Sequence, residues 1–343
     1  MRFSIGLPTC TEGLMYPVPF ADFPEVVALA QEAEALGYYA VMGNDHFTTP
    51  RYVRRAFPRP PRFYEPLVTY AFLAARTERI RLMTGVLVLP MREPVLLAKQ
   101  VATLDLASNG RVILGVGVGA YREELEAVFP DRRGLRRGEL TDEMIPALRA
   151  LFGRRVASFA GRHIRFEDVE LYPKPVQDPL PIYAAGNAPE AARRAGRCCD
   201  GWIPAVLSPD EVRQRLEIVR EAARQAGRDL AGFEVAPQLV VAIGSTPEQA
   251  REKLQGSQLF EHLVSLRRST LRGQDLARVE ERCLVGTPDQ ICRQVEAYRA
   301  AGVTHLSGLL FAADTLTEFR EQMRLFGREV VATFAGHSPG GPP

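Results

Sequence analysis

Hydrophobic and polar positions alternate on two scales along this chain. Short apolar runs rich in β-branched residues are separated by longer stretches whose apolar residues recur at helical spacing. Several of these runs are apolar nearly throughout, as strands that are buried on both faces must be. The pattern predicts eight strands, at Phe3–Pro8, Tyr38–Gly43, Ile80–Leu89, Val112–Val116, Pro181–Ala184, Asp200–Ile203, Phe233–Ile243 and Val303–Phe311.

The stretches between these runs carry the start and stop signals of helices. Asp22 precedes a helix whose apolar face includes Val26 and Leu29, and Gly37 follows its last turn. Three later segments share a capping hydroxyl, then a proline, then Glu or Gln where a capping box needs it. These segments are Ser208-Pro-Asp-Glu211, Thr246-Pro-Glu-Gln249 and Thr287-Pro-Asp-Gln290.

Strand–helix alternation predicts an α/β protein with a parallel sheet and right-handed crossovers. Eight strands favour a closed TIM (β/α)8 barrel over an open sheet, and we expect one domain over residues 1–335. Three segments exceed ordinary connections, about 44–63, 153–180 and 255–283, and we place them as insertions at the C-terminal mouth. Residues 336–343 (GHSPGGPP) are expected to form a disordered tail.

Composition narrows the class of protein. The chain has 343 residues, of which 46% are hydrophobic and 24% charged, so a large core is feasible. A net charge of +2 gives no strong attraction to nucleic acid or membrane, and no apolar run approaches a membrane span. Five cysteines without a C-x-x-C motif, and no evident signal peptide, predict a reduced, cytoplasmic protein. No metal site is expected, since the histidines show no ligand spacing.

The run RVILGVGVGA (residues 111–120) ends in alternating glycines. Its spacing is G-x-G-x-G rather than G-x-G-x-x-G, and it follows the fourth predicted strand, so a Rossmann dinucleotide site is disfavoured. Two interpretations remain open. The glycines either relieve crowding at the barrel rim or let a flat ring lie close to the strand end.

Other strand ends carry candidate chemistry. In GNDHF (43–47), Asp45 and His46 end the second strand, where an imidazole is a natural proton donor or acceptor and a neighbouring carboxylate could tune it. The alternative is a structural pair that holds the following loop. A serine hydrolase is not favoured, because no G-x-S-x-G motif occurs.

In YAAGNAPEAARRAG, Asn187 can cap a helix with Glu190 completing the box, or the glycine and helix start can seat a phosphate. Gly85 interrupts the third strand, which suggests a bulge or a close approach of backbone.

These stretches together resemble the bacterial luciferase-like superfamily of flavin- and deazaflavin-dependent oxidoreductases. The resemblance spans nearly the whole chain in the right order, and the combination is far more specific than any single motif. It is carried by GNDHF (43–47) and by residues 79–129, 181–202 and 284–306.

The resemblance implies a TIM barrel with the cofactor ring across the ends of strands two to four. Asp45 and His46 match the family's acid–imidazole pair and are the implied catalytic residues. Gly85 and Val86 match a bulge that in many relatives contains a cis peptide. The implied cofactor-binding residues are Asp45, Gly85, Val86, Gly117 and Gly119 at the ring, and Gly186, Asn187 and Ala188 at the phosphate.

Two cofactors fit this resemblance, coenzyme F-420 and FMN, and we favour F-420. Arginine-rich loops at 51–62 and 267–272 suit its anionic tail, and the chain resembles the shorter subgroup often assigned to F-420. Relatives that use F-420 often carry an acidic residue where this chain has Ala120, which disfavours a sugar-phosphate dehydrogenase. Residues such as Leu14, Met15, Tyr16, Phe20, Phe47 and Tyr52 favour a small, apolar organic substrate.

The implied reaction is hydride transfer, with His46 supplying a proton. The alternative is an FMN-dependent monooxygenase that uses reduced FMN and oxygen and needs a separate flavin reductase. An alternative of another class is a non-catalytic flavin-binding or partner subunit. Barrels of this superfamily usually dimerise through outer helices, so a homodimer is expected.

Overall fold

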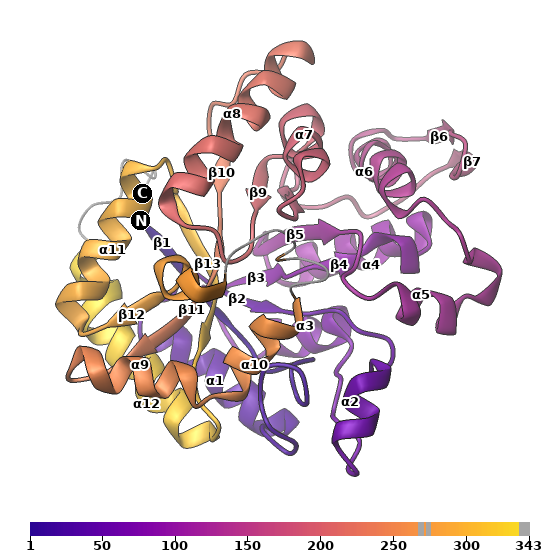
Figure 1. Cartoon of the computed structure of the whole chain (residues 1–343). Coiled ribbons are helices and arrows are strands. Elements are labelled where there is room, and N and C mark those ends of the chain that lie inside the picture. Colours follow the sequence, from indigo (N-terminus) through magenta and orange to yellow (C-terminus); the bar gives the residue numbers. More distant parts are fainter. Residues whose placement is uncertain (267–270, 272–275, 336–343) are drawn as a thin grey trace.

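The computed structural model describes residues 1–266, 271 and 276–335, and within them the chain forms the predicted parallel barrel (Figure 1). The strands are apolar and buried, as the sequence pattern requires; all six residues of β5, VILGVG, are buried. The barrel strands are β1 (Arg2–Gly6), β2 (Ala40–Gly43), β3 (Arg81–Thr84), β4 (Leu87–Val88), β5 (Val112–Gly117), β8 (Ile182–Ala185), β9 (Gly201–Ile203), β10 (Glu234–Val235), β11 (Gln238–Ile243) and β13 (His305–Phe311).

The barrel closes where one strand changes partners. Neighbouring strands run in the order β10-β9-β8-β5-β3-β2-β1-β13-β11, and β10 and β11 are consecutive in the chain. The Ala236 N–H donates to Trp202 O of β9 at 2.8 Å. On the opposite side, the Ser307 N–H of β13 donates to Pro237 O at 2.9 Å. The two ends of the sheet are therefore joined through residues 236 and 237, which makes the TIM barrel.

Helices surround the barrel and begin at the predicted caps. Asp22, Ser208 and Thr287 each form a full capping box. Thr246 accepts from the Gln249 N–H, but the Gln249 side chain bonds the Ser245 hydroxyl instead of closing a box. The surrounding helices are α1 (Phe23–Ala35), α3 (Pro66–Ala74), α4 (Pro94–Ala107), α6 (Arg137–Gly153), α7 (Pro189–Cys198), α8 (Pro209–Gln225), α11 (Pro288–Ala300), α12 (Leu316–Phe326) and α13 (Ala332–Ala335).

The long segments carry secondary structure of their own. Residues 44–63 contain α2 (Arg51–Ala56), and β6 (Ala157–Ala160) pairs with β7 (Arg165–Val169) as an antiparallel hairpin beyond α6 (Figure 1). The third segment includes part of α9 (Pro247–Gln255) and all of α10 (Gln258–Ser265). Sequence analysis did not predict β12 (Leu284–Gly286), a three-residue strand that pairs with β11. Short helical turns complete the described chain, at Leu89–Met91, Pro130–Arg132 and Leu276–Arg282, with α5 (Arg122–Val128) and a π turn at Gly327–Val331.

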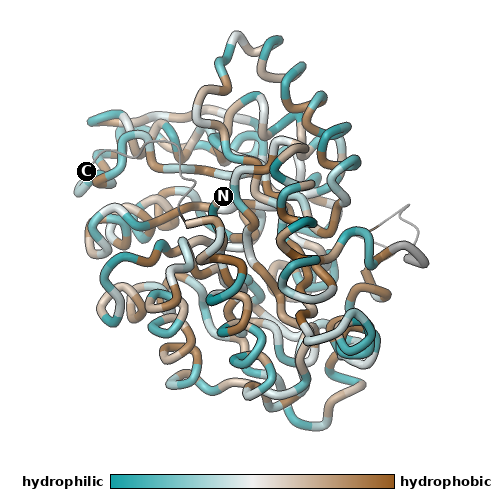
Figure 2. The backbone as a smooth tube through the Cα atoms, turned by 90° about the vertical axis from the view of Figure 1, so that its left-hand side faces the viewer, coloured by the Kyte–Doolittle hydropathy of each residue, from teal (hydrophilic) through white to brown (hydrophobic). Residues whose placement is uncertain are grey.

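Some of the expectations fall outside the described residues. Arg267, Arg268 and Arg272 lie there, as does the predicted tail at 336–343. Along the described chain, hydrophobic stretches gather in the interior and hydrophilic positions line the outer turns of the helices (Figure 2). None of the helices in this part of the chain is long and apolar enough to cross a membrane.

A buried histidine lies in the barrel wall where β13 begins. The His305 ring is fully buried, its Nε2 contacts the Ser4 hydroxyl of β1, and Tyr39 packs edge-on at 5.3 Å between ring centroids. Burial, together with the nearby charge of Arg2, lowers the pKa of His305 to about 3. The folded protein therefore holds this imidazole neutral.

We expect the free energy of unfolding to fall as the pH drops from about 6.5, the ordinary pKa of histidine, toward 3. Below pH 6.5 the unfolded chain binds a proton on His305 that the folded chain does not, so folded stability is lost, by roughly a few kcal/mol. Urea unfolding at pH 7, 5 and 4 measures this. His305→Gln keeps a polar group toward Ser4 without titrating, and should show a weaker pH dependence; an unchanged dependence contradicts the assignment.

Candidate active site

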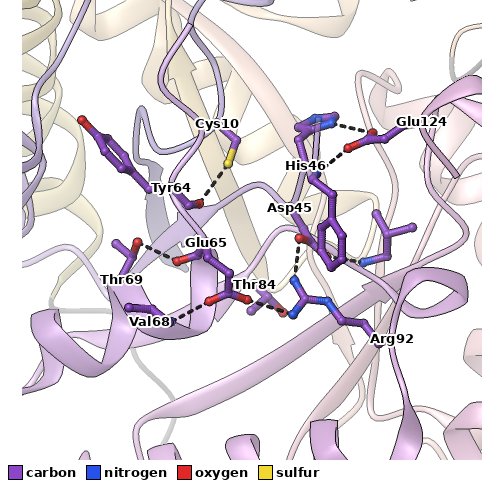
Figure 3. A network of polar contacts seen from close by, with 12 residues as sticks. Cys10, Asp45, His46, Tyr64, Glu65, Val68, Thr69, Thr84, Arg92 and Glu124 are labelled. Carbon is purple, nitrogen blue, oxygen red and sulfur yellow. Dashed lines mark hydrogen bonds and ion pairs between the residues drawn. The ribbon is translucent and has the colours of Figure 1, made fainter. Parts of the chain in front are cut away.

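The polar network at the mouth of the barrel is organised by one buried carboxylate, Glu124 of α5 (Figure 3). Its Oε2 lies 3.0 Å from His46 Nδ1, and its Oε1 accepts from the Phe47 N–H at 2.5 Å and the Thr48 N–H at 3.2 Å. The Glu124 side chain is only 3% exposed and that of His46 only 11%. An acceptor on Nδ1 fixes the ring orientation and leaves Nε2 as the nitrogen for chemistry.

Asp45 does not accompany His46, contrary to the expected acid–imidazole pair. Its carboxylate accepts from Arg92 Nη2 at 2.7 Å and from the Val88 N–H at 2.9 Å. Both residues lie in the loop that follows β2, where the Asp45 side chain points toward Arg92 and the His46 ring toward Glu124 (Figure 3). Burial raises the pKa of Asp45, and Arg92 and Val88 oppose that rise. Asp45 therefore joins β2 to β4, and the carboxylate at His46 is Glu124.

The alternating glycines of β5 make room for a neighbouring strand. A Cβ on Gly117 would lie 2.7 Å from Val86 Cγ2, and one on Gly119 would lie 2.8 Å from Val88 Cγ1. Gly119 also has φ +80°, which disfavours other residues. These contacts favour relief of crowding as the reason for the glycines. Gly119 additionally lines an open groove, so it stays a candidate for cofactor contact.

The predicted bulge at Gly85 lies between β3 and β4. The Gly85–Val86 peptide bond is cis, as the resemblance to this superfamily implies. A Cβ on Gly85 would lie 2.1 Å from Met42 Cε, so the side chain of Met42 leaves no room for a larger residue at this position. Val86 packs against the same interior group, which includes Met42 and Met83.

A groove of about 520 Å³ runs over the ends of β5 and β8. It brings together the predicted phosphate residues Gly186, Asn187 and Ala188 with Gly119. Asn187 does not cap α7, because the N-cap is Ala188. The Asn187 side chain instead exchanges two 2.8 Å hydrogen bonds with the backbone of Ala205. Glu190 accordingly closes no box and pairs with Arg193.

Arginines line the other side of this groove, and none of them was among the residues predicted to bind the cofactor. Arg137 donates to Val118 O and Gly119 O, at 3.2 and 2.7 Å, and so is fixed to the rim. Arg122 and Arg136 are exposed beside it, and Arg194 is held by Asp142. The arginines of loop 51–62 do not line this groove. Arg62, for example, forms an ion pair with Glu12 at 2.6 Å.

A second cavity, of about 130 Å³, lies between the barrel mouth and α10. Leucines dominate its lining, and its polar members are Asn44, His46, Gln238, His262 and the Tyr121 side chain. Ala120 lines both this cavity and the arginine groove, so the two meet at that residue. One cofactor could therefore be held by both, with the arginine groove suited to a charged part and the cavity lining to an apolar part.

The apolar residues expected to surround the substrate divide between the cavity and the packing of the loops, and the aromatic ones among them do not line the cavity. Leu14 and Met15 line the cavity. Tyr16 stacks on Phe20 at 4.3 Å between ring centroids, away from it. The Phe47 ring packs on the Arg92 guanidinium, 4.7 Å from its central carbon. The Tyr52 hydroxyl forms a hydrogen bond with the Tyr121 hydroxyl at 3.1 Å.

Comparison with known proteins identifies the class. The family described as luciferase-like monooxygenase matches residues 1–305. The chain belongs to this family, whose members are flavin- or F-420-dependent oxidoreductases and monooxygenases, and it is an enzyme of that kind.

Individual relatives include both kinds of activity. The F420-dependent glucose-6-phosphate dehydrogenase of Kineococcus radiotolerans is 28% identical over 305 residues, covering 84% of this chain and 86% of its own. Two solved structures share the fold with a TM-score of 0.77 each. The monooxygenase RslO1 from Streptomyces bottropensis is 24% identical, covering 97% of this chain and all of that one. An F420-dependent secondary alcohol dehydrogenase in complex with an F420–acetone adduct is 19% identical, covering 96% and 98%.

Glu124→Gln should destabilise the protein by about 1–3 kcal/mol, because an amide cannot accept all the hydrogen bonds that this buried carboxylate accepts. The matched control is Glu123→Gln. Glu123 is the adjacent residue on α5 and is more exposed, with an Arg51 ion pair at 3.4 Å, so its loss should cost less than about 1 kcal/mol. Denaturant unfolding of both variants measures the difference; equal losses would contradict the role given to Glu124.

Proposed function

We propose that this protein is an F-420-dependent oxidoreductase that transfers a hydride to or from a small, largely apolar carbonyl or alcohol substrate. The observation that carries the proposal is the groove at β5 and β8, where backbone and arginine side chains of one rim face the start of α7. The deazaflavin would supply the hydride chemistry when bound.

The groove suits a long anionic group. Helix α7 has ten residues and begins at Pro189, close to Gly186. Pro189 has no N–H and the Ala191 N–H donates to Ala188 O at 3.0 Å, so the first turn offers an anion the Glu190 N–H and the positive end of the helix dipole. Arg122 and Arg136 extend the positive charge beyond that turn toward solvent. FMN offers one phosphate, which the helix start alone could hold. Arg136 pairs with Glu139 at 2.7 Å at an exposed site, where ion pairs are weak, and Arg122 donates to Leu135 O at 3.4 Å. A charged tail continuing past the phosphate would add a stronger anionic partner for both arginines, which is why we favour F-420.

The cavity suits an apolar substrate. Leu14, Leu259, Leu263 and Leu310 are among the leucines that line it. Burying these surfaces against a hydrocarbon body is favourable, whereas a sugar phosphate would leave its hydroxyls facing leucine. The same lining has Ala120 where many F-420-dependent relatives have an acid. A sugar phosphate is therefore disfavoured as substrate, despite the similarity to a glucose-6-phosphate dehydrogenase.

The chain's own residues would position and protonate the substrate. Glu124 holds the His46 ring by Nδ1, so that Nε2 gives a proton to a developing alkoxide or takes one from an alcohol. Asp45 and Arg92 lock the loop on which His46 stands. The leucines around the cavity exclude water from the reacting atoms.

Side-by-side titration of the purified protein with F-420 and FMN tests the cofactor. We expect F-420 to bind in the micromolar range and FMN more weakly. Preferential binding of reduced FMN would overturn the choice and favour an oxygen-using monooxygenase with a separate reductase. Failure to bind either would favour a non-catalytic subunit.

Substitution of the two outer arginines of the groove distinguishes F-420 from FMN. Arg122→Gln combined with Arg136→Gln should weaken F-420 more than tenfold and FMN little, since only the longer tail reaches them. Arg133→Gln, an exposed arginine on the same segment that does not line the groove, is the control.

His46→Ala should leave F-420 binding intact and reduce turnover by about 10²–10⁴, the usual contribution of a positioned proton donor. The assay follows oxidation of reduced F-420 by cyclohex-2-en-1-one or by simple ketones. His163→Ala is the control, because His163 lies on the β6–β7 excursion, 3.3 Å from Glu139. Unchanged turnover in His46→Ala would remove His46 from the reaction.

A further inference from the structure

The cavity beside His46 contains a second histidine that the reaction above does not use. His262 lies on α10, the helix of the third long segment, and is 6% exposed. It lines the cavity together with His46. Within the described residues its Nδ1 is buried and has no hydrogen-bond partner.

An orphaned nitrogen of this kind is unusual. Buried polar atoms nearly always have a partner, and one left without costs about 1–3 kcal/mol. The neighbours of His262 on its own helix, Leu259 and Leu263, are buried hydrocarbons that offer no hydrogen bond. A leucine or phenylalanine here would complete the apolar wall at lower cost. The imidazole therefore points to a polar group that enters the cavity from outside the chain.

The charge of the ring restricts that group. Burial, and then the neighbouring His46, lower the pKa of His262 to about 4. At neutral pH the imidazole is uncharged, with one donor and one acceptor nitrogen. A neutral ring in an apolar wall matches a carbonyl or hydroxyl oxygen and does not compensate a phosphate or carboxylate.

Resting on the proposed function, we propose that His262 binds the oxygen of the carbonyl or alcohol substrate from the α10 side of the cavity. His46 stands on the loop after β2, with Nδ1 committed to Glu124. Two imidazoles from separate segments would then share one oxygen. His46 handles the proton, and His262 orients the oxygen and selects ligands that have one. Ligands of the same shape without an oxygen would leave Nδ1 of His262 unpaired.

The test uses two ligands of one shape, cyclohexanone and methylenecyclohexane, in which C=CH2 replaces C=O. Each is titrated into the full-length holoprotein carrying ¹³C-labelled histidine. The chain has five histidines, so the ring signals are few, and the signal lost in His262→Phe assigns His262. We expect cyclohexanone to shift the His262 signal and to bind about tenfold tighter than methylenecyclohexane, the ratio one ordinary hydrogen bond gives.

Variants separate this role from packing. His262→Phe keeps a flat ring but no nitrogen and should reduce the tenfold preference severalfold, mainly by weakening cyclohexanone, while His46 still contacts the oxygen. His262→Asn restores a polar group near the position of Nδ1 and should recover part of the preference. His163→Phe, outside the cavity, should keep all of it. A preference that is undiminished in His262→Phe overturns the proposal, as does a wild-type His262 signal that neither ligand moves, which would mean that water satisfies the ring.

This outcome is independent of the cofactor. If FMN binds in place of F-420, the proposed function fails, but the two ligands are compared in the FMN-loaded protein. If neither cofactor binds, they are compared in the protein alone, because the readout is the histidine signal and the affinity ratio rather than turnover. If cyclohexanone does not shift the His262 signal in F-420-loaded protein, the inference is wrong, while the proposed function is unaffected.

Discussion

A single buried carboxylate fixes the mouth of this barrel. Glu124 accepts hydrogen bonds from two successive backbone amides after β2 and also holds the His46 ring. Because those amides begin the long segment over the mouth, the carboxylate sets the direction in which that segment leaves the strand. It also joins the segment to α5, which follows the glycine rim of β5. The imidazole, the loop and the rim thus share one anchor.

Around this anchor, the barrel arranges two chemically different spaces. One is lined by arginines and lies over β5 and β8; the other is apolar and lies between the barrel mouth and α10. They meet at Ala120, whose methyl group is too short to divide them. The proposed cofactor, with a charged tail and a flat ring, would use both spaces, and the proposed apolar substrate would use the second. The arrangement explains why the binding residues come from so many strand ends.

The architecture could be predicted from the sequence because local signals and the global fold agree. Apolar runs gave the barrel strands, and hydroxyl–proline caps gave the starts of several helices. At the site, motifs that end strands singled out His46 and residues 186–188, and the structure places the first in the apolar cavity and the others in the groove. Asp45 was misassigned as the partner of His46, since adjacency in sequence does not reveal that neighbouring side chains point apart.

The rest of the site depends on contacts between distant segments. Glu124 lies 78 positions from His46, and only the folded chain brings them together. Arg137 and His262 stand on ordinary amphipathic helices, where an arginine or histidine carries no signal of its own. The alternating glycines at the end of β5 are the opposite case. Their motif suggested contact with a ligand, but close packing against Val86 and Val88 accounts for Gly117 and Gly119.

The separate origin of the two spaces has a consequence for how such a protein can diverge. The walls of the cationic groove are built from residues between 118 and 194, whereas the α10 wall of the apolar cavity belongs to the segment between β11 and β12. Replacing that segment would change the lining of the apolar cavity without changing the groove that we propose for the cofactor. The substrate preference of such a barrel can therefore change through the α10 segment alone, while the strands and the core stay the same.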